Sequence, residues 1–186
     1  TGKAVRYQSE AADPRSLSSN NIAAIYEAPD GMFWVATGGY SLPGRGLNRF
    51  DPRTGAAEHF LPNPSIADSL SANDLMTLWG DSDGTLWIGT WTRGLDRMEL
   101  ARPGHFVHYK NDRFFPESLG GDEVWSLYQD RSGILWIGTA HSGISKLPAN
   151  SGQFSLYRNI PGNPSSLSHN AIGAFAGPRE AQGFRA

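Results

Sequence analysis

Short apolar runs separated by turn residues recur along the whole chain. The first run of each unit reads IAAIYEA, LMTLWGD or VWSLYQD, ends at PDG, DSDG or RSG, and is followed by FWVAT or LWIGT. These runs are rich in β-branched and aromatic residues, which favour strands, and the Gly supplies the positive φ of a tight turn. Two shorter runs complete each unit, and no 3.6-residue apolar period is sustained long enough for a helix. The pattern predicts four antiparallel strands per unit.

The unit occurs three times, and its landmarks keep the same order and spacing. The segments DGMFWVAT, DGTLWIGT and SGILWIGT place tryptophans at positions 34, 87 and 136, which are 53 and 49 residues apart. Each segment is preceded by SLSSNNI, SLSANDL or SLGGDEV and followed by GLNR, GLDR or GISK, and a further copy, SLSHNAI, begins at Ser166. The first unit is longer because the stretch between Thr37 and Gly46 carries five more residues than its counterparts. Insertion in one loop of a repeat is how repeat proteins vary.

Four-stranded units of this length, with Trp and Gly at fixed offsets, are typical of β-propeller blades, which bury their faces by stacking on one another. We therefore predict an all-β fold in which residues 1–186 form one propeller segment. The predicted blades are 17–61, 70–110 and 119–158, and the predicted partial strands are 4–9 and 170–176. Three blades are fewer than the four to eight that close a ring. The segment should be a fragment of a closed propeller, or should assemble into one by homo-oligomerisation or with further blades, because an open arc exposes apolar faces.

Composition narrows the function. Lys and Arg number 16 against 18 Asp and Glu, so the net charge of −2 argues against a nucleic-acid partner. The absence of cysteine excludes disulfides, thiol nucleophiles and Cys-ligated zinc. No apolar run approaches 18 residues, so we expect no membrane contact by this segment itself. The chain opens with TGKAVRY, without a start Met or a signal peptide, and is expected to be a piece of something larger.

The repeat closely resembles the two-component regulator propeller repeat. In the second unit the matching residues are Leu70, Ser71, Asn73, Leu75, Asp83, Gly84, Leu86–Thr90, Gly94, Leu95 and Arg97. The resemblance implies the periplasmic or extracytoplasmic sensor of a membrane-anchored regulator, often a hybrid histidine kinase or a diguanylate cyclase. It also implies a ligand-sensing role, with an oligosaccharide as the expected ligand, and no enzymatic activity in this segment.

Candidate ligand-binding residues are those that differ between units on the loop-rich face of the propeller. They are Tyr40, Arg45, Trp91, Arg93, Trp125 and His141. Aromatic platforms mixed with polar groups suit a sugar, which has an apolar face and paired hydroxyl donors and acceptors. Polar residues that recur near the same loops are expected instead to satisfy turn backbone groups. These recurring residues are Asn20, Asn21, Asn73, Asp74, Asp122, Glu123, His169 and Asn170.

No catalytic, cofactor or metal site is expected. His105 and His108 lie three apart in a strand and so point to opposite faces, and DSDG lacks the spacing of a calcium loop. Two alternatives to sensing stay open. One is a scaffold for protein–protein assembly. The other is a propeller lyase or carbohydrate-active enzyme, with His141 beside Asp122 or Glu123 as the reactive group.

Overall fold

The computed structural model describes residues 2, 4–149 and 151–176. The propeller segment predicted from the sequence, 1–186, also contains residues 1, 3, 150 and 177–186, which lie outside the described residues. In the described part, three four-stranded antiparallel sheets follow one another along the chain. Their strands are β1 Ile22–Glu27, β2 Phe33–Thr37, β3 Leu47–Phe50, β4 Ala57–Phe60, β5 Leu75–Gly80, β6 Thr85–Thr90, β7 Leu95–Glu99, β8 Phe106–Tyr109, β9 Val124–Gln129, β10 Leu135–Thr139, β11 Ile144–Leu147 and β12 Ser155–Tyr157. These residues form no helix, and so none that could cross a membrane.

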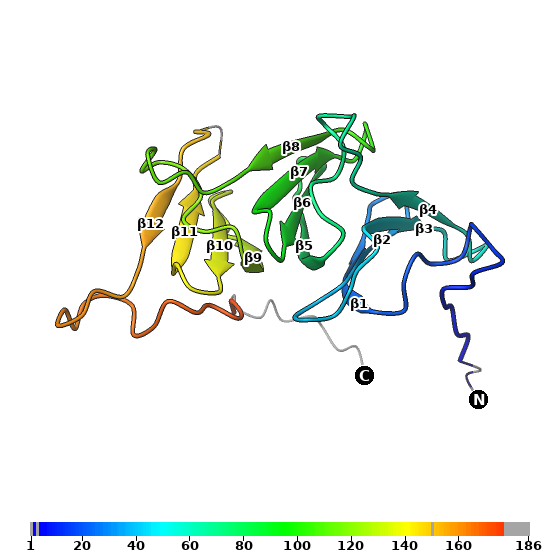
Figure 1. Cartoon of the computed structure of the whole chain (residues 1–186), viewed down its shortest axis with the longest axis horizontal. Helices are drawn as coiled ribbons and strands as arrows, with labels where there is room; N and C mark the ends of the chain where they lie inside the picture. Colours follow the sequence, from blue (N-terminus) through cyan, green and yellow to red (C-terminus); the bar gives the residue numbers. More distant parts are fainter. Residues whose placement is uncertain (1, 3, 150, 177–186) are drawn as a thin grey trace.

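The three sheets stand side by side as the blades of an open arc (Figure 1). Strands β1, β5 and β9 line its concave side, and β5 contacts both β1 and β9. Strands β4, β8 and β12 lie on the outside (Figure 1). The predicted all-β propeller architecture with three complete blades is therefore confirmed.

Aromatic residues hold each blade against the next. Trp34 of blade one is 1% exposed and lies 5.4 Å from Phe60, whose ring is 6.4 Å from Phe106 of blade two. Tyr109 connects blades two and three in the same way. Its ring centroid lies 5.8 Å from that of Trp87 in blade two and 5.6 Å from that of Phe154 in blade three. Trp34 and Phe106 are almost fully buried, and full burial of a large apolar side chain contributes about 1.5–3 kcal/mol. Blade stacking is therefore the main source of the core.

Backbone hydrogen bonds join neighbouring parts of the arc at the loop-rich face. The amide of Gly94, just before β7, donates to the carbonyl of Asp122 in the loop before β9, at 2.9 Å. Gly46 donates to Asn73 in the same way, and Gly143 donates to Asn170. These glycines have positive φ values, and a Cβ on Gly94 would lie 2.2 Å from the Tyr109 carbonyl oxygen. Only glycine fits this position, which explains its recurrence in the sequence.

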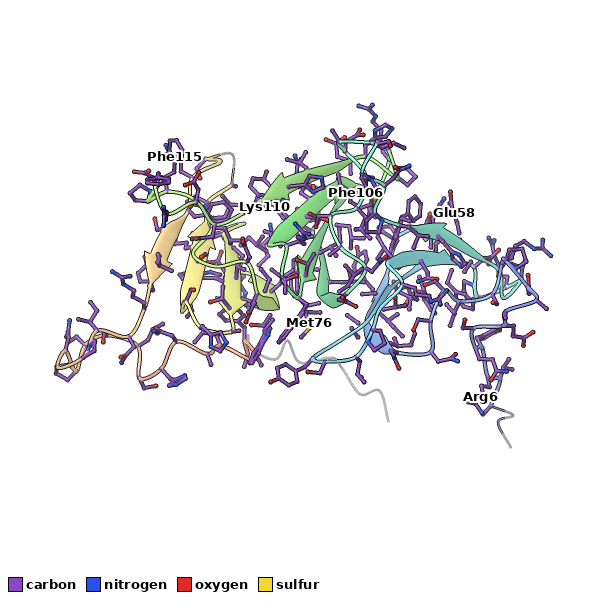
Figure 2. All side chains as sticks on the ribbon, viewed as in Figure 1. Arg6, Glu58, Met76, Phe106, Lys110 and Phe115 are labelled. Carbon is purple, nitrogen blue, oxygen red and sulfur yellow. The ribbon has the colours of Figure 1, made fainter. Side chains whose placement is uncertain are left out.

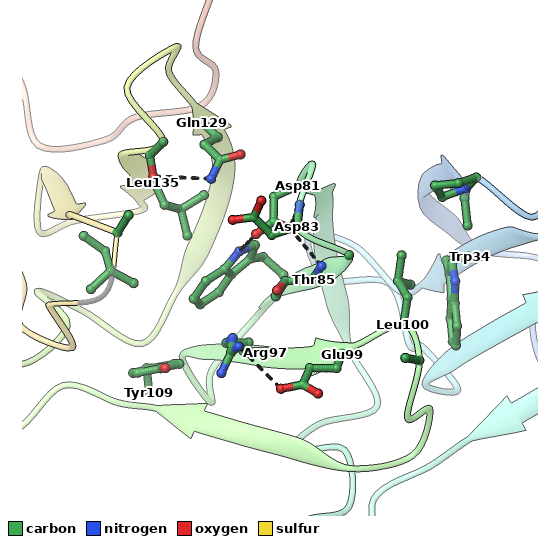
Figure 3. Close-up of a pocket in the computed structure, with 18 of the residues that line it drawn as sticks. Trp34, Asp81, Asp83, Thr85, Arg97, Glu99, Leu100, Tyr109, Gln129 and Leu135 are labelled. Carbon is green, nitrogen blue, oxygen red and sulfur yellow. Dashed lines mark hydrogen bonds and ion pairs between the residues drawn. The ribbon is translucent and has the colours of Figure 1, made fainter.

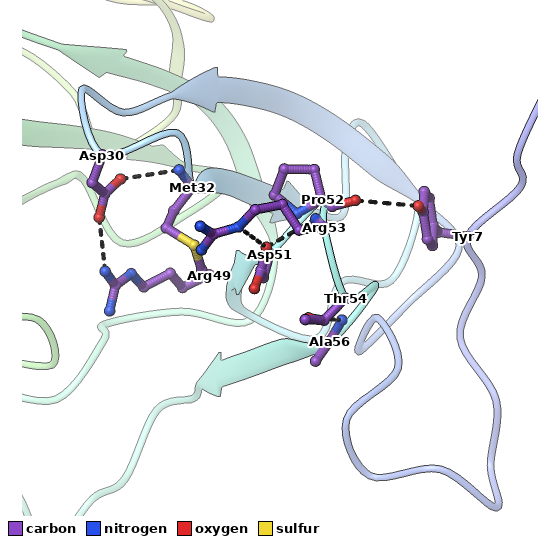
Figure 4. A network of polar contacts seen from close by, with 9 residues as sticks. All are labelled: Tyr7, Asp30, Met32, Arg49, Asp51, Pro52, Arg53, Thr54 and Ala56. Carbon is purple, nitrogen blue, oxygen red and sulfur yellow. Dashed lines mark hydrogen bonds and ion pairs between the residues drawn. The ribbon is translucent and has the colours of Figure 1, made fainter.

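The predicted partial strands are wrong: neither 4–9 nor 170–176 contains a strand. A strand needs a hydrogen-bonded neighbour, and the neighbours that these segments would pair with are not among the described residues. Both segments nevertheless pack on the arc. Tyr7 packs edge-on against Phe50 at 4.8 Å, and its hydroxyl donates to the carbonyl of Pro52 at 3.4 Å (Figure 4). Ile172 donates from its amide to the Thr139 carbonyl at 2.9 Å.

Candidate ligand-binding site

The loops before the inner strands and the loops between the second and third strands of each blade lie together, as the sequence predicts. Gly38 donates its backbone N–H to the carbonyl of Asn21 at 2.8 Å. Trp91 donates likewise to Asp74, and Ala140 to Glu123, both at 3.0 Å. The same contact in three blades places the residues that vary between blades on one face.

Each inner strand carries a β-bulge near its start. The pairing register shifts around Ala23 in β1, Met76 in β5 and Trp125 in β9. Met76 lies on the concave side of the arc (Figure 2). A bulge re-aims a side chain and is common beside functional sites. All three blades have the bulge, but only blade three has an aromatic residue, Trp125, at the bulged position.

Four of the six predicted residues meet in what we call the aromatic cluster: Tyr40, Trp91, Trp125 and His141. The Tyr40 ring is perpendicular to both indoles, with centroids 4.9 Å from Trp91 and 6.1 Å from Trp125. The two indole planes differ by only 9°, with centroids 6.4 Å apart. His141 lies 6.5 Å from Trp125. The cluster therefore draws side chains from all three blades.

The long loop of blade one brings Tyr40 to the other blades. Its Gly44 amide donates to a carboxylate oxygen of Asp74 in blade two at 2.6 Å. On the blade-one side, the Asn21 amide group donates to the carbonyl of Pro43 at 3.0 Å. Tyr40 itself is 65% exposed, so its position depends on these anchors and on the two indoles. The insertion is thus the element that links blade one to the cluster.

Two polar atoms at the cluster are buried without a hydrogen-bond partner among the described residues. They are the indole Nε1 of Trp125 and Oε2 of Glu123. Oε2 lies 3.4 Å from Nε2 of the exposed His141, but the pair does not meet hydrogen-bond geometry. A buried polar atom that makes no hydrogen bond costs about 1–3 kcal/mol of stability.

A cleft of about 210 Å³ opens beside this pair. Its walls are formed by Thr92, Gly121, Asp122, Glu123, Thr139, His141 and Ser142. From the sequence, Glu123 is expected among the recurring structural residues or, in the enzymatic alternative, beside His141, and it is not among the six candidate ligand-binding residues. The signal available was chemical variation, since the aligned positions hold Asn21, Asp74 and Ala171.

Arg45 and Arg93 do not join the cluster. Each donates its backbone N–H to a threonine hydroxyl, Thr37 for Arg45 at 2.8 Å and Thr90 for Arg93 at 2.9 Å. Within the described part of the chain, neither guanidinium makes an ion pair or a hydrogen bond. Both are exposed, so a role for them in binding stays a prediction.

Comparison with known proteins gives the family of the repeat. Residues 16–39 and 118–141 each match the family model of the two component regulator propeller. Two of the three blades thus contain a segment that matches this repeat. No curated protein matches it.

Solved structures with the same fold include two extracellular domains from B. thetaiotaomicron. The domain of the hybrid two-component system BT3049 is 25% identical, with a TM-score of 0.69 over 81% of this chain and 20% of its own. The domain of BT4673 is 24% identical, with a TM-score of 0.66 over 91% of this chain and 21% of its own. The present chain therefore spans about a fifth of either domain. Virginiamycin B lyase from Staphylococcus aureus shares the fold at 15% identity, with a TM-score of 0.53 over 78% of this chain and 43% of its own.

The polar residues that recur in these propeller repeats serve the backbone. Side-chain oxygens of Asn20, Asp122 and Asn170 accept hydrogen bonds from the amides of the segments before them, at 2.6–2.8 Å. At the matching position of the second repeat the preceding segment has Pro62, which has no N–H to donate. These contacts support the structural role expected for the recurring residues.

A larger cavity of about 750 Å³ lies between the blades at the other ends of the strands (Figure 3). The repeat pattern of the sequence does not predict this cavity. Asp81 accepts from Trp87 Nε1 at 3.3 Å, and Arg97 lies 6.0 Å from the same indole ring. Asp130 accepts from Trp136 at 2.8 Å, and this hydrogen bond is the main cause that lowers the Asp130 pKa. Because the arrangement recurs in successive repeats, we interpret the cavity lining as blade scaffolding.

No group of three His, Asp or Glu residues that could hold a metal ion occurs in the described ranges. His105 and His108 take separate carboxylate partners, Asp68 at 2.6 Å and Asp96 at 2.7 Å.

Proposed function

We propose that this chain is part of the extracytoplasmic sensor propeller of a two-component-type regulator and binds a glycan at the aromatic cluster. The observation that carries the proposal is the convergence of Tyr40, Trp91, Trp125 and His141 from three blades onto one face. The extracellular domains that share its fold support the extracytoplasmic location.

The chemistry of the cluster suits a sugar. Trp91 and Trp125 are half-buried and nearly parallel, so they can offer flat apolar surface to the C–H face of a pyranose. Glu123 and His141 lie beside them and can bond hydroxyl groups. Aromatic surface with a few polar groups at its edge is the usual composition of a small-molecule site.

The position of the cluster gives binding a mechanical consequence. Tyr40 belongs to blade one, Trp91 to blade two and Trp125 to blade three, so one ligand would contact all three. A ligand shifts a conformational equilibrium only by its differential affinity for the two states. Contacts that bridge blades would favour one relative position of the blades, which the parent regulator would transmit across the membrane.

A protein-binding scaffold is the second candidate, and one observation favours it. Phe114 is 74% exposed at a turn between blades two and three, and the neighbouring Phe115 is also exposed. The turn is fixed by the Phe114 amide, which donates to Asp112, and by the Asp112 amide, which donates to the Ser118 hydroxyl, both at 2.9 Å. Tyr, Trp and Phe are enriched at protein–protein interfaces, so two exposed phenylalanines on this turn favour a binding surface.

The test is calorimetric titration of the chain with a panel of neutral and acidic oligosaccharides. We expect at least one to bind and Trp91→Ala to weaken it about tenfold or more, the equivalent of about 1.4 kcal/mol. Phe114→Ala is the matched control, because it removes an exposed aromatic outside the cluster. No binding by any oligosaccharide, or equal loss in the two variants, would contradict the proposal. Turnover abolished by His141→Ala would favour the enzymatic alternative.

A further inference from the structure

One position of the repeat contacts the loops of the aromatic cluster in all three blades. It is occupied by Asn21, Asp74 and Glu123, immediately before the inner strands β1, β5 and β9. Each residue is half-buried, and its backbone carbonyl accepts a hydrogen bond from the loop between the second and third strands of its blade. A carbonyl requires no particular side chain, and Ala171 occupies the position in the fourth copy of the repeat segment. The polar side chains at this position are therefore free for another role.

Asn21 and Asp74 hold one peptide unit of the blade-one loop from two sides. The carbonyl of Pro43 accepts from the Asn21 side chain at 3.0 Å, and the N–H of the next residue, Gly44, donates to the Asp74 carboxylate at 2.6 Å. An amide side chain can donate to a carbonyl and a carboxylate cannot, so the two side chains are not interchangeable. A hydrogen bond to a carboxylate is charge-assisted and roughly twice as strong as a neutral one. Asp74 is thus the stronger of the two anchors.

Asp74 also fixes Tyr40 and Trp91 relative to each other. Its side chain holds the loop that carries Tyr40, and its backbone carbonyl accepts from the Trp91 amide at 3.0 Å. Within the loop, the Leu42 amide donates to the Gly39 carbonyl at 3.2 Å and closes the turn that presents the Tyr40 ring. The distance of 4.9 Å between the Tyr40 and Trp91 ring centroids therefore depends on the Asp74 carboxylate.

The equivalent residue of blade three faces the loop that carries His141. Oε2 of Glu123 lies 3.4 Å from Nε2 of His141, whose ring is 6.5 Å from Trp125. The side chain at this repeat position is thus an amide, a short carboxylate or a longer carboxylate, and each meets a loop that differs between blades. Such matched variation indicates a position that shapes the cluster rather than the blade.

We propose that Asp74 is a positioning residue of the ligand site, an inference that rests on the glycan binding proposed above. Its carboxylate holds the Tyr40 loop across the junction of blades one and two, so that a ligand meets the Tyr40 ring already placed beside Trp91. Preorganisation of this kind lowers the ordering cost of binding. Asn21 and Glu123 set the loops of blades one and three in the same way.

The placement is tested in the unliganded full chain through the nuclear magnetic resonance signal of the Trp91 indole N–H, assigned with Trp91→Phe. An aromatic ring shifts the signals of nuclei beside it, so Tyr40→Ala should move this signal. We expect Asp74→Ala to move it in the same direction by a similar amount, and the double variant to move it no further than Tyr40→Ala. Asp74→Asn keeps an acceptor oxygen and should leave the signal close to its wild-type position.

Asp112→Ala is the matched control for this measurement. It removes a carboxylate that accepts from the Phe114 amide at 2.9 Å in a turn outside the cluster, and it should leave the Trp91 signal unchanged. Additive shifts in the double variant would show that Asp74 acts on Trp91 without Tyr40. That result, or an unchanged signal in Asp74→Ala, would overturn the inference.

Calorimetry with maltohexaose, cellohexaose and tetragalacturonic acid as probes measures the consequence for binding. Tyr40→Ala and Asp74→Ala should each weaken the tightest probe about fivefold, and the double variant about fivefold rather than about twenty-fivefold. A full further loss from Asp74→Ala in the Tyr40→Ala background would overturn the inference and leave glycan binding standing. No binding by any probe would instead contradict the proposed function, while the Trp91 signal still decides whether Asp74 places Tyr40.

Discussion

His108 forms an ion pair with a fully buried carboxylate inside blade two. Its Nδ1 lies 2.7 Å from Oδ1 of Asp96, and Oδ2 of Asp96 accepts from the Ser71 amide at 2.9 Å. The hydrogen bond to Asp96 is the main cause that raises the His108 pKa, against the opposing effect of burial. A raised folded-state pKa gives stability that is fully present below about pH 6.5 and is lost as the pH rises through the raised value.

We therefore expect the free energy of unfolding of the wild type to exceed that of His108→Gln by about 1.5 kcal/mol near pH 5.5. The difference should shrink as the pH rises towards 9, while the other histidines cancel because both proteins carry them. Chemical denaturation across this range measures it. A difference that stays constant with pH would show that the charge on His108 does not contribute.

The sequence predicts the residues of the aromatic cluster better than it predicts polar pairs. Trp91, Trp125 and His141 stand out because they occupy repeat positions at which the other blades have different residues. The His108–Asp96 pair gives no such signal. The positions aligned with Asp96 hold Asn48 and Ser145, which also bond the loop before the inner strand, so a polar residue there is expected whether or not it is charged.

Two turn glycines of blade two differ in why a side chain is excluded. Gly94 has φ +84°, and a Cβ there would also meet the Tyr109 carbonyl oxygen. Gly84, in the turn between β5 and β6, has φ +80° but no atom within 4 Å of a Cβ. The two positions therefore separate backbone strain from steric conflict.

Gly84→Ala should lower the free energy of unfolding by about 1 kcal/mol, the cost of a left-handed conformation. Gly94→Ala should cost about 2 kcal/mol more, because the strand that carries Tyr109 must also move. Urea denaturation of the two variants measures the difference. Equal decreases in the free energy of unfolding would mean that the hydrogen bond from Gly94 to Asp122, between blades two and three, tolerates a side chain at position 94.

Periodicity predicts the complete blades because each strand pairs within its own repeat. The same reasoning fails at 4–9 and 170–176, where the landmarks Tyr7 and Ile172 are present but the described residues include no strand that pairs with them. The contact of Tyr40 with blades two and three was also beyond sequence reasoning, because it depends on the path of a loop. That path is set by the bond between Gly44 and Asp74, which no repeat pattern encodes.

The arc ends in two faces whose counterparts are buried between blades. On blade three, Trp136 is half-buried and its neighbour Tyr157 is 46% exposed, because no blade follows them in the described chain. On blade one, Ile22 is exposed where Leu75 and Val124 of the other blades are fully buried. These faces have the composition of the blade interfaces already present, so a second copy of the chain can cover them in the same way.

We expect the purified chain to associate, with a solution mass of at least twice 20.2 kDa by light scattering coupled to size exclusion. Tyr157→Lys should reduce the associated fraction, since it places a charge on the exposed face of blade three. A folded monomer at every concentration would contradict self-association and would mean that other parts of a longer protein, or the terminal segments, cover these faces.

The central claim is that the tryptophans of the aromatic cluster contact the ligand and that the tryptophans of the blade core do not. Nuclear magnetic resonance of the indole N–H groups tests it directly, with Trp91→Phe and Trp125→Phe used for assignment. On titration with the oligosaccharide that binds most tightly, we predict shifts in the Trp91 and Trp125 signals and unchanged Trp34 and Trp87 signals. Shifts confined to Trp34 and Trp87, or no shift in any indole signal at saturating ligand, would contradict the account.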